Sequence, residues 1–435
     1  MAGRVAGIGL VVLALVAGYR ALTSDAEPSA GTHPSFLYGR ITAVSGTIYE
    51  GRLRFGGNQE AFWGDFFNGF RDENPWVDHV PTDRLPRERS DIEIFGVTIW
   101  RHERRIDLRR PFMARFGDIA RIEAKGRDLT VTLKSGSVAH LDRYSADDFA
   151  DGLRVWDDRH GVVDLDERKI RSIDLLGPAR SGASPSHRLH GTVHTRQGDF
   201  TGFLQWDREG AVGLDEFEGF TIDGELLSLP FNTIRTLARS SRKSSVATLL
   251  DGREIVLSDT RQAGDGHRGI YVDDARYGRV LISWDAFERV DLGAIDDGPG
   301  GSGPAYDDFP PGRPLAGIIT TRTGRRLAGR LVYDLDESEF IETLDAPYQG
   351  VDYTIPFGLV ASVVLHGSGE GAAGRARVSL HSGEVLQLER SGDLGDGNAG
   401  FLIFVDGEHA AYVPWADVER VDFERPREMY PPLVR

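Results

Sequence analysis

Cysteine is absent from this chain of 435 residues, and lysine occurs at only four positions. Without cysteine there is no disulfide, no thiolate metal site, no iron–sulfur cluster and no cysteine nucleophile. Nearly all of the 51 basic residues are therefore arginines, a bias typical of GC-rich coding in bacteria. Beyond residue 22 no apolar run approaches the roughly 20 residues that a membrane-spanning helix needs.

Basic residues are also outnumbered by acidic ones. The chain has 51 lysines and arginines against 67 aspartates and glutamates, a formal net charge of −16. Such a chain repels phosphate backbones over most of its surface, so we expect no nucleic-acid partner. Residues 1–120 hold 15 acids and 15 bases, so the acidic excess lies beyond residue 120.

The N-terminus has the layout of an export signal. A short basic stretch, Met1 to Arg4, precedes an apolar run of 14 residues from Val5 to Gly18. Polar and small residues follow up to Ala30. We expect a signal peptide over residues 1–30, or a retained N-terminal membrane anchor if the run is counted through Leu22. Either reading predicts a periplasmic or extracellular protein.

An internal repeat organises the rest of the chain. The first half of each copy, half A, carries a Gly-x-Leu-x-aromatic motif and closes with Phe-x-x-aliphatic-x-x-aliphatic. In the three copies these positions are Gly51, Leu53, Phe55, Phe116, Ile119 and Ile122; Gly202, Leu204, Trp206, Phe231, Ile234 and Leu237; and Gly329, Leu331, Tyr333, Phe357, Val360 and Val363. A different half B follows each time and ends in a similar apolar triplet, at Ile170, Ile173 and Leu175; Phe287, Val290 and Leu292; and Val418, Val421 and Phe423.

Each half has the pattern of a small β unit. Alternation as in Phe200, Gly202, Leu204 and Trp206 is typical of a strand with one apolar face. Short apolar segments recur between Gly and Asp turns, a signature of β-barrels and sandwiches. The closing triplet predicts one 3₁₀ turn at Phe231, leading into a last strand. We therefore expect an all-β fold of three tandem A–B pairs of small five-stranded, SH3-like barrels.

Residues 323–346 resemble the first signature of the Sm-like proteins. They contain a glycine turn, a second glycine in a bent strand, the aromatic-Asp pair Tyr333-Asp334 and a returning apolar strand. The resemblance implies a Sm-like barrel. The loop asparagine of that family is absent after Asp334, and Ile355-Pro356-Phe357 stands where the family has Arg-Gly, so the resemblance implies the fold and not RNA binding.

Gly- and Pro-rich linkers separate the A–B pairs. We expect barrel pair 1 at residues 36–177, barrel pair 2 at 187–293 and barrel pair 3 at 313–425, with a Gly/Pro linker at 294–312 and a tail at 426–435. Single halves of about 50 residues are marginal alone, so A and B should stabilise one another. The linkers predict three loosely packed modules.

Copy one carries an insertion, residues 60–110, that the other copies replace with a short hairpin. Its aromatic residues are spaced as on one face of a helix, so we expect a helix bearing Phe62, Trp63, Phe66, Phe67 and Phe70. This aromatic stripe either plugs the open end of the first barrel or, with Trp76, binds a partner or ligand. Nine arginines from Arg84 to Arg115 alternate with five acids and favour a solvated, salt-bridged face.

The sequence holds no recognisable catalytic motif. His-Glu-x-x-His, Gly-x-Ser-x-Gly, a phosphate-binding loop and a dinucleotide fingerprint are all missing. The histidines His187, His190 and His194 have a strand spacing too wide for one metal. We predict no catalytic residue, no metal and no cofactor.

We therefore expect a non-catalytic envelope or secreted binding or scaffold protein whose copy-one aromatic residues recognise an envelope protein or a glycan. The alternative is a carbohydrate-binding or carbohydrate-active protein, with stacking and acid–base groups supplied by Trp63, Asp65, Asp72, Glu73 and Trp76. RNA binding through Sm-like barrels is a third class, and it requires a cytosolic protein.

Overall fold

A computed structural model describes residues 33–56, 59–81, 110–178, 187–293, 303–365, 374–405 and 409–427, and the backbone of 87–94 and 97–105. These residues form an all-β structure of antiparallel strands with short 3₁₀ turns and one short α-helix, α2 (Asp147–Ala150). No helix in this part of the chain is long and apolar enough to cross a membrane. The expected signal peptide, the first part of the 294–312 linker and most of the tail lie outside the described residues.

Copy one contains twelve strands among these residues. They are β1 (Tyr38–Ala43), β2 (Ile48–Phe55), β3 (Phe66–Phe70), β4 (Arg87–Ile94), β5 (Val97–Arg105), β6 (Pro111–Arg115), β7 (Ile119–Lys125), β8 (Asp128–Leu133), β9 (Val138–Asp142), β10 (Leu153–Asp157), β11 (Gly161–Leu165) and β12 (Ile170–Leu175). The pair β4–β5 forms a two-stranded sheet of its own and has no counterpart in the other copies.

The other copies have ten strands each in the same part of the structure. Copy two has β13 (His190–Thr195), β14 (Gly198–Gln205), β15 (Glu216–Phe220), β16 (Leu226–Pro230), β17 (Ile234–Arg239), β18 (Ser244–Leu249), β19 (Glu254–Ser258), β20 (Ile270–Asp274), β21 (Gly278–Ile282) and β22 (Phe287–Leu292). Copy three has β23 (Ala316–Thr321), β24 (Arg326–Tyr333), β25 (Thr343–Tyr348), β26 (Val351–Pro356), β27 (Val360–Leu365), β28 (Arg375–Leu380), β29 (Val385–Glu389), β30 (Phe401–Phe404), β31 (Ala410–Val413) and β32 (Val418–Phe423).

One strand order occurs three times. The first sheet runs β11-β10-β2-β1-β12-β7-β8-β9, and the corresponding strands of copies two and three follow one another in the same order. The 3₁₀ turn predicted at the end of half A is also present in all three copies, as η2 (Phe116–Asp118), η5 (Phe231–Thr233) and η7 (Phe357–Leu359). The chain therefore has a repeated β architecture.

Strands of halves A and B are intermixed within each sheet. In copy one, β1 of half A lies between β2 and β12, the last strand of half B, and β2 pairs with β10 of half B. Each sheet also has two ends in the described strands. The separate closed five-stranded barrels expected from the sequence are therefore not formed there, because A and B complete one another's sheet.

The repeated glycine of half A marks a close approach between these strands. Gly51, Gly202 and Gly329 each face the backbone of the strand corresponding to β10, and an added Cβ would overlap a carbonyl oxygen in all three copies. The glycines Gly39 and Gly191, one strand earlier, face β12 and β22 in the same manner. Only glycine fits such a position, which explains why the motif recurs.

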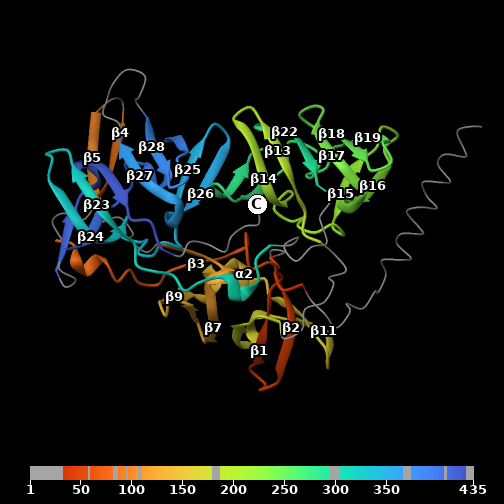
Figure 1. Cartoon of the computed structure of the whole chain (residues 1–435), viewed down its shortest axis with the longest axis horizontal. Coiled ribbons are helices and arrows are strands. Elements are labelled where there is room, and N and C mark those ends of the chain that lie inside the picture. Colours follow the sequence, from red (N-terminus) through yellow and green to blue (C-terminus); the bar gives the residue numbers. More distant parts are fainter. Residues whose placement is uncertain are drawn as a thin grey trace, which may run out of the picture.

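The three copies are packed together and do not form the loose array expected from their linkers. Copies two and three share one apolar core, and β21 of copy two pairs with β26 of copy three. The linker residues Tyr306 and Phe309 are buried in the core of copy one. In Figure 1, copies two and three lie side by side above copy one.

The predicted aromatic helix of copy one is wrong. Phe62, Trp63 and Gly64 form a turn in which Gly64 has φ of +92°, and Phe66–Phe70 is strand β3, paired with β6. The helical spacing arose because only the start of β3 is covered on both faces, while Asn68 and Phe70 further along are exposed. Phe67 points into the core of copy one, while Phe66 lies under Arg279 of copy two.

Candidate functional site

The aromatic residues predicted as a binding surface are mostly buried. The exposed fractions of Phe62, Trp63, Phe66 and Phe67 are 0%, 4%, 5% and 0%, whereas that of Phe70 is 51%. The Phe62 ring lies 5.0 Å from that of Tyr306, and the Trp63 ring 6.3 Å from that of Phe309. Of the two alternatives that the sequence left open, burial inside the protein is the one that this arrangement favours.

The sixth predicted residue, Trp76, belongs to a segment that fastens copy one to copy three. We call residues 71–81 the strap. The half-buried Trp76 ring lies 6.2 Å from that of Phe404, and Val80 is buried against the same sheet. Asn74 Nδ2 donates a hydrogen bond to the Leu335 carbonyl oxygen at 2.8 Å. The strap therefore uses its apolar side chains within the molecule.

Arg71, the first residue of the strap, and Arg110 enter a group of acidic side chains on copy three. Arg71 lies 2.9 Å from Glu342 and 3.5 Å from Asp336, and Arg110 lies 3.0 Å from Asp334. The side chains of these three ion pairs are largely buried, between 10% and 17% exposed. Contacts of this kind hold copy one against copy three through charge as well as apolar area.

The acidic side chains that face these arginines form one cluster. We define the carboxylate cluster as the six acids that influence one another at this end of β24 and β25: Asp334, Asp336, Glu337, Glu342, Asp345 and Asp393. Burial raises the pKa of Asp334 and of Asp345 to about 6 and that of Asp336 to about 7. Burial likewise places the pKa values of Glu337 and Asp393 well above their usual range. Two arginines thus face six acids, and several acids favour the protonated form near neutral pH.

Copy two satisfies the corresponding aspartate from within itself. Asp207 and Asp334 both follow the aromatic residue of the repeat motif, have positive φ, and accept a backbone N–H just before the strand that corresponds to β10. The arginines beside Asp207 are Arg261, at 2.7 Å, and Arg268, at 3.6 Å.

In copy three the positions that correspond to these arginines are uncharged. Gly269 of copy two corresponds to Gly400 of copy three. Arg268 precedes Gly269, whereas Ala399 precedes Gly400. Gln262 of copy two corresponds to Asp393 of copy three, because the two side chains accept equivalent backbone N–H groups, from Glu218 and Asp345. The residue before Gln262 is Arg261, whereas the residue before Asp393 is Gly392. Copy three has lost both arginines, and copy one supplies Arg71 and Arg110 in their place.

Several other carboxylates have the same structural task in each copy. Asp65 Oδ2 accepts the backbone N–H groups of Glu60 and Ala61. Asp215 and Glu342 accept the equivalent pairs in copies two and three. Such side chains close a turn that would otherwise leave buried donors unpaired.

The acid–base set of the carbohydrate alternative is scattered over different environments. Trp63 and Asp65 are 4% and 3% exposed, while Asp72 and Glu73 are exposed. Asp65 also lies 3.4 Å from Arg279 of copy two. Asp65 therefore serves the backbone and the joint between copies one and two.

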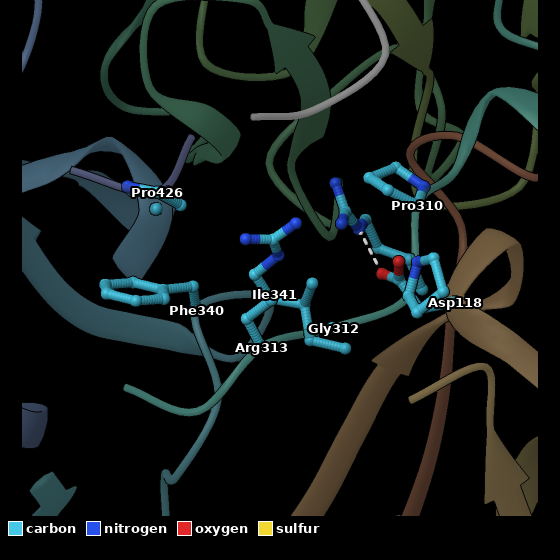
Figure 2. Close-up of a pocket in the computed structure, with 10 residues that line it drawn as sticks. Asp118, Pro310, Gly312, Arg313, Phe340, Ile341 and Pro426 are labelled. Carbon is cyan, nitrogen blue, oxygen red and sulfur yellow. Dashed lines mark hydrogen bonds and ion pairs between the residues drawn. The ribbon is translucent and has the colours of Figure 1, made fainter. Parts of the chain in front are cut away.

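The hollow shown in Figure 2 lies where copy one, the linker and copy three meet. Its lining includes Arg115, Asp118, Arg313 and Phe340, and the Arg115 Nε–Asp118 Oδ2 ion pair of 2.7 Å is buried. The cavity volume is about 30 Å³, which is enough for very few water molecules. It is too small for an organic ligand.

A larger open groove of about 720 Å³ lies on copy one. Its lining includes the basic side chains of Arg54, Arg154 and Lys169 and the acidic side chains of Asp151 and Glu167. Charges of both signs give this groove no preference for an anion or a cation.

The described residues hold no group of three or more histidines, aspartates or glutamates arranged to bind a metal ion. His194 instead lies between Asp199, at 2.8 Å, and Asp291, at 2.9 Å. Burial lowers the pKa of His194, but its hydrogen bonds to both carboxylates outweigh this effect and raise the pKa above its usual value.

The sequence points to Asp334 and to the insertion, but nothing in it connects Arg71 and Arg110 directly with copy three. Their partners lie more than 220 residues away in the chain. The absence of arginine at Gly392 and Ala399, compared with Arg261 and Arg268, is the sequence signal that could have revealed the connection. Comparison with other proteins adds no assignment, since no protein-family model, no curated protein and no solved structure matches this chain.

Proposed function

We propose that the chain is a non-catalytic, exported binding or scaffold protein of the cell envelope. The observation that carries this proposal is that buried or largely buried carboxylates of the chain are occupied in holding its own backbone and its copies together. Asp65, Asp215 and Glu342 close equivalent turns, and Asp334 and Asp336 pair with arginines of another copy. Side chains committed in this way stabilise a framework and are not free for acid–base chemistry.

We also propose that each copy descends from a pair of SH3-like or Sm-like units. Within copy two the hairpin β15–β16 follows β19 at one end of the sheet, and the hairpin β20–β21 follows β14 at the other. This symmetric order supports an origin by duplication of one small unit, followed by interlocking of the two halves.

Recognition by this scaffold is expected from the outer part of the copy-one insertion. Phe70, Asp72 and Glu73 are exposed there, beside the half-buried Trp76. An envelope protein or glycan that contacts this region would meet one aromatic ring and two carboxylates. The buried Phe62, Trp63, Phe66 and Phe67 would support that surface from beneath.

Affinity capture from envelope extracts tests the proposal. The full chain is compared with a version that carries Phe70→Ser, Asp72→Asn and Glu73→Gln, three exposed positions whose substitution keeps β3, the strap and Arg110 in place. A version with the equally exposed substitutions Tyr144→Ser, Asp223→Asn and Glu225→Gln is the control. Loss of the captured set in the first version alone supports recognition by the insertion, and equal capture by all three proteins contradicts it.

The carbohydrate alternative has its own outcome. Turnover of an envelope polysaccharide by the full chain, abolished by Glu73→Gln or Asp72→Asn with no change in unfolding temperature, would make the protein an enzyme. Both residues are exposed, so their substitution leaves the packed interior untouched.

A further inference from the structure

Two of the strands that stand at sheet ends, β16 and β11, each have a single paired neighbour among the described strands. β16 stands at the end of the 12-stranded sheet and pairs with β15 alone among the described strands. β11 stands at the end of the first sheet and pairs with β10 alone in that part of the chain. Their outer N–H and C=O groups are positioned to accept another strand.

The strands that correspond to these two edges are paired with one another elsewhere in the chain. β21, the equivalent of β11, pairs with β26, the equivalent of β16. In that joint Arg279 lies opposite Thr354 and Ile282 opposite Val351. The repeat thus contains a donor edge and an acceptor edge that fit, and one such joint is already made between copies two and three.

A pair of matching residues shows that the unused edges keep the shape of this joint. Pro356 ends β26 and contacts Gly278 so closely that a Cβ on the glycine would overlap the proline ring. The corresponding residues are Pro230, at the end of β16, and Gly161, at the start of β11. A Cβ on Gly161 would meet no atom within 4 Å. The glycine is present at β11, but no proline lies against it.

Exposed apolar side chains accompany both edges. Leu226 on β16 is 58% exposed and Val162 on β11 is 52% exposed. On the same hairpin as Leu226, Phe220 is 38% exposed and the turn residue Ile222 is 98% exposed. Natural edge strands usually carry charges or centrally placed prolines that prevent pairing, whereas β16, Leu-Leu-Ser-Leu-Pro, contains no charge and its one proline stands at the end of the strand.

We propose that β16 of one molecule pairs with β11 of a second copy of this chain. The register is that of the β21–β26 joint, which places Ser228 opposite Val162 and Leu227 opposite Val163. The Arg279–Asp65 and Arg54–Asp215 contacts fix copies one and two relative to each other within one molecule, and β11 and β16 lie apart in Figure 1, so the partner strand comes from another molecule. Such a contact joins two different surfaces and produces a ring or an open chain of molecules. The inference does not depend on the proposed function.

Cysteine cross-linking tests the register directly, because the chain has no cysteine of its own. Directly opposed residues of antiparallel strands have Cα atoms about 4.5–5.5 Å apart, within the range of a disulfide. A chain carrying Val162→Cys and Ser228→Cys should form disulfide-linked multimers under mild oxidation. The control carries Val162→Cys and Val385→Cys, since Val385 is also 52% exposed and lies on β29, another sheet edge.

Cross-linking no greater than in this control would overturn the proposal. So would a disulfide formed within single chains, because β11 and β16 of one molecule would then pair with each other.

Molar mass in solution provides an independent test. Leu226→Asp, which sets a second acid opposite Asp164 in this register, and Val162→Lys should each abolish the higher-mass species that the unmodified chain forms, whereas Val385→Lys should leave them unchanged. An equimolar mixture of the first two variants keeps one intact edge of each kind and should stop at two chains. An unmodified chain that stays monomeric at every concentration reached would refute the pairing.

Discussion

At the scale of single residues, the charge balance of copy three depends on copy one. Asp207 of copy two has Arg261 and Arg268 beside it, while Asp334 faces Arg110 from copy one. A buried carboxylate without a partner is costly, so losing two arginines within a copy is tolerable only if others replace them. Arg71 and Arg110 meet this need, and copy three therefore relies on contacts that it does not itself encode.

Replacing Arg71 by methionine should destabilise the protein by about 3–5 kcal/mol, because Asp336 and Glu342 would be left buried without their cation. The free energy of unfolding in urea measures the effect. Arg40→Met is the matched control, since the Arg40–Glu50 pair is 50% and 37% exposed and should contribute about 0–1 kcal/mol. Adding Asp336→Asn to Arg71→Met should restore part of the loss. Equal costs for Arg71→Met and Arg40→Met would contradict this account of the cluster.

The carboxylate cluster should also make the protein more stable as the pH falls from 8 to about 5. Burial raises the pKa of Asp334 to about 6 and that of Asp336 to about 7, whereas both groups titrate near pH 4 in the unfolded chain. The folded state therefore takes up protons over this range and gains stability, about 1.4 kcal/mol for each unit of raised pKa. Below the unfolded pKa the gain ends.

Urea midpoints at pH 8 and pH 5.5 measure this dependence. Asp336→Asn removes one titrating group from the cluster, so the difference between the two midpoints should be smaller in this variant than in the unmodified chain. An identical pH dependence in both proteins would show that Asp336 is not responsible.

At the scale of elements, the sequence predicts what local spacing determines. The glycines that face a neighbouring backbone, the 3₁₀ turns at Phe116, Phe231 and Phe357, and the threefold repetition all follow from short-range pattern. The sequence could not reveal which half supplies the strand next to β1, because the pairing of β1 with β12 joins residues far apart in the chain. Phe66 and Phe67 misled the assignment because β3 is buried on both faces at its start, where two successive apolar residues break the alternation typical of a strand.

The position of β3 predicts opposite outcomes for two nearby phenylalanines. Phe67→Ala should cost about 3–5 kcal/mol, because the fully buried ring packs 6.3 Å from that of Phe55 and 6.0 Å from that of Phe116. Phe70→Ala, at the exposed end of the same strand, should change the stability by about 0.5 kcal/mol or less. Denaturant unfolding distinguishes them. Similar costs at both positions would favour the helical arrangement that the structure replaces.

The close approach at the repeated glycine gives a second test at this scale. Gly202→Ala would bring a Cβ into the Asp273 carbonyl oxygen on β20, so we expect a loss of about 1–3 kcal/mol from the forced separation of two strands. Gly397→Ala is the control, since its Cβ would meet no atom within 4 Å. If both alanines prove neutral in thermal unfolding, close backbone approach is not the reason for the repeated glycine.

At the scale of the whole molecule, the three copies are packed against one another. Copies two and three share a core, and the linker residues Tyr306 and Phe309 enter the core of copy one. Lys134 reinforces this attachment, since its Nζ donates a hydrogen bond to the Phe309 carbonyl oxygen at 3.2 Å and lies 3.4 Å from the centre of the Tyr306 ring. A linker that looks flexible in composition thus becomes part of the interior through two aromatic residues.

The unmodified chain should therefore unfold in one calorimetric transition, with equal van't Hoff and calorimetric enthalpies. Phe309→Asp places a charge where the ring is 2% exposed and should detach copy one, which then melts separately at a lower temperature. Leu250→Asp, at a side chain that is 57% exposed, is the control and should leave the single transition intact. Separate transitions in the unmodified chain would mean that the copies fold independently. A single transition in the Phe309→Asp variant would mean that the strap and its arginines hold copy one in place without the linker. The comparison thus separates the contribution of the linker from that of the carboxylate cluster.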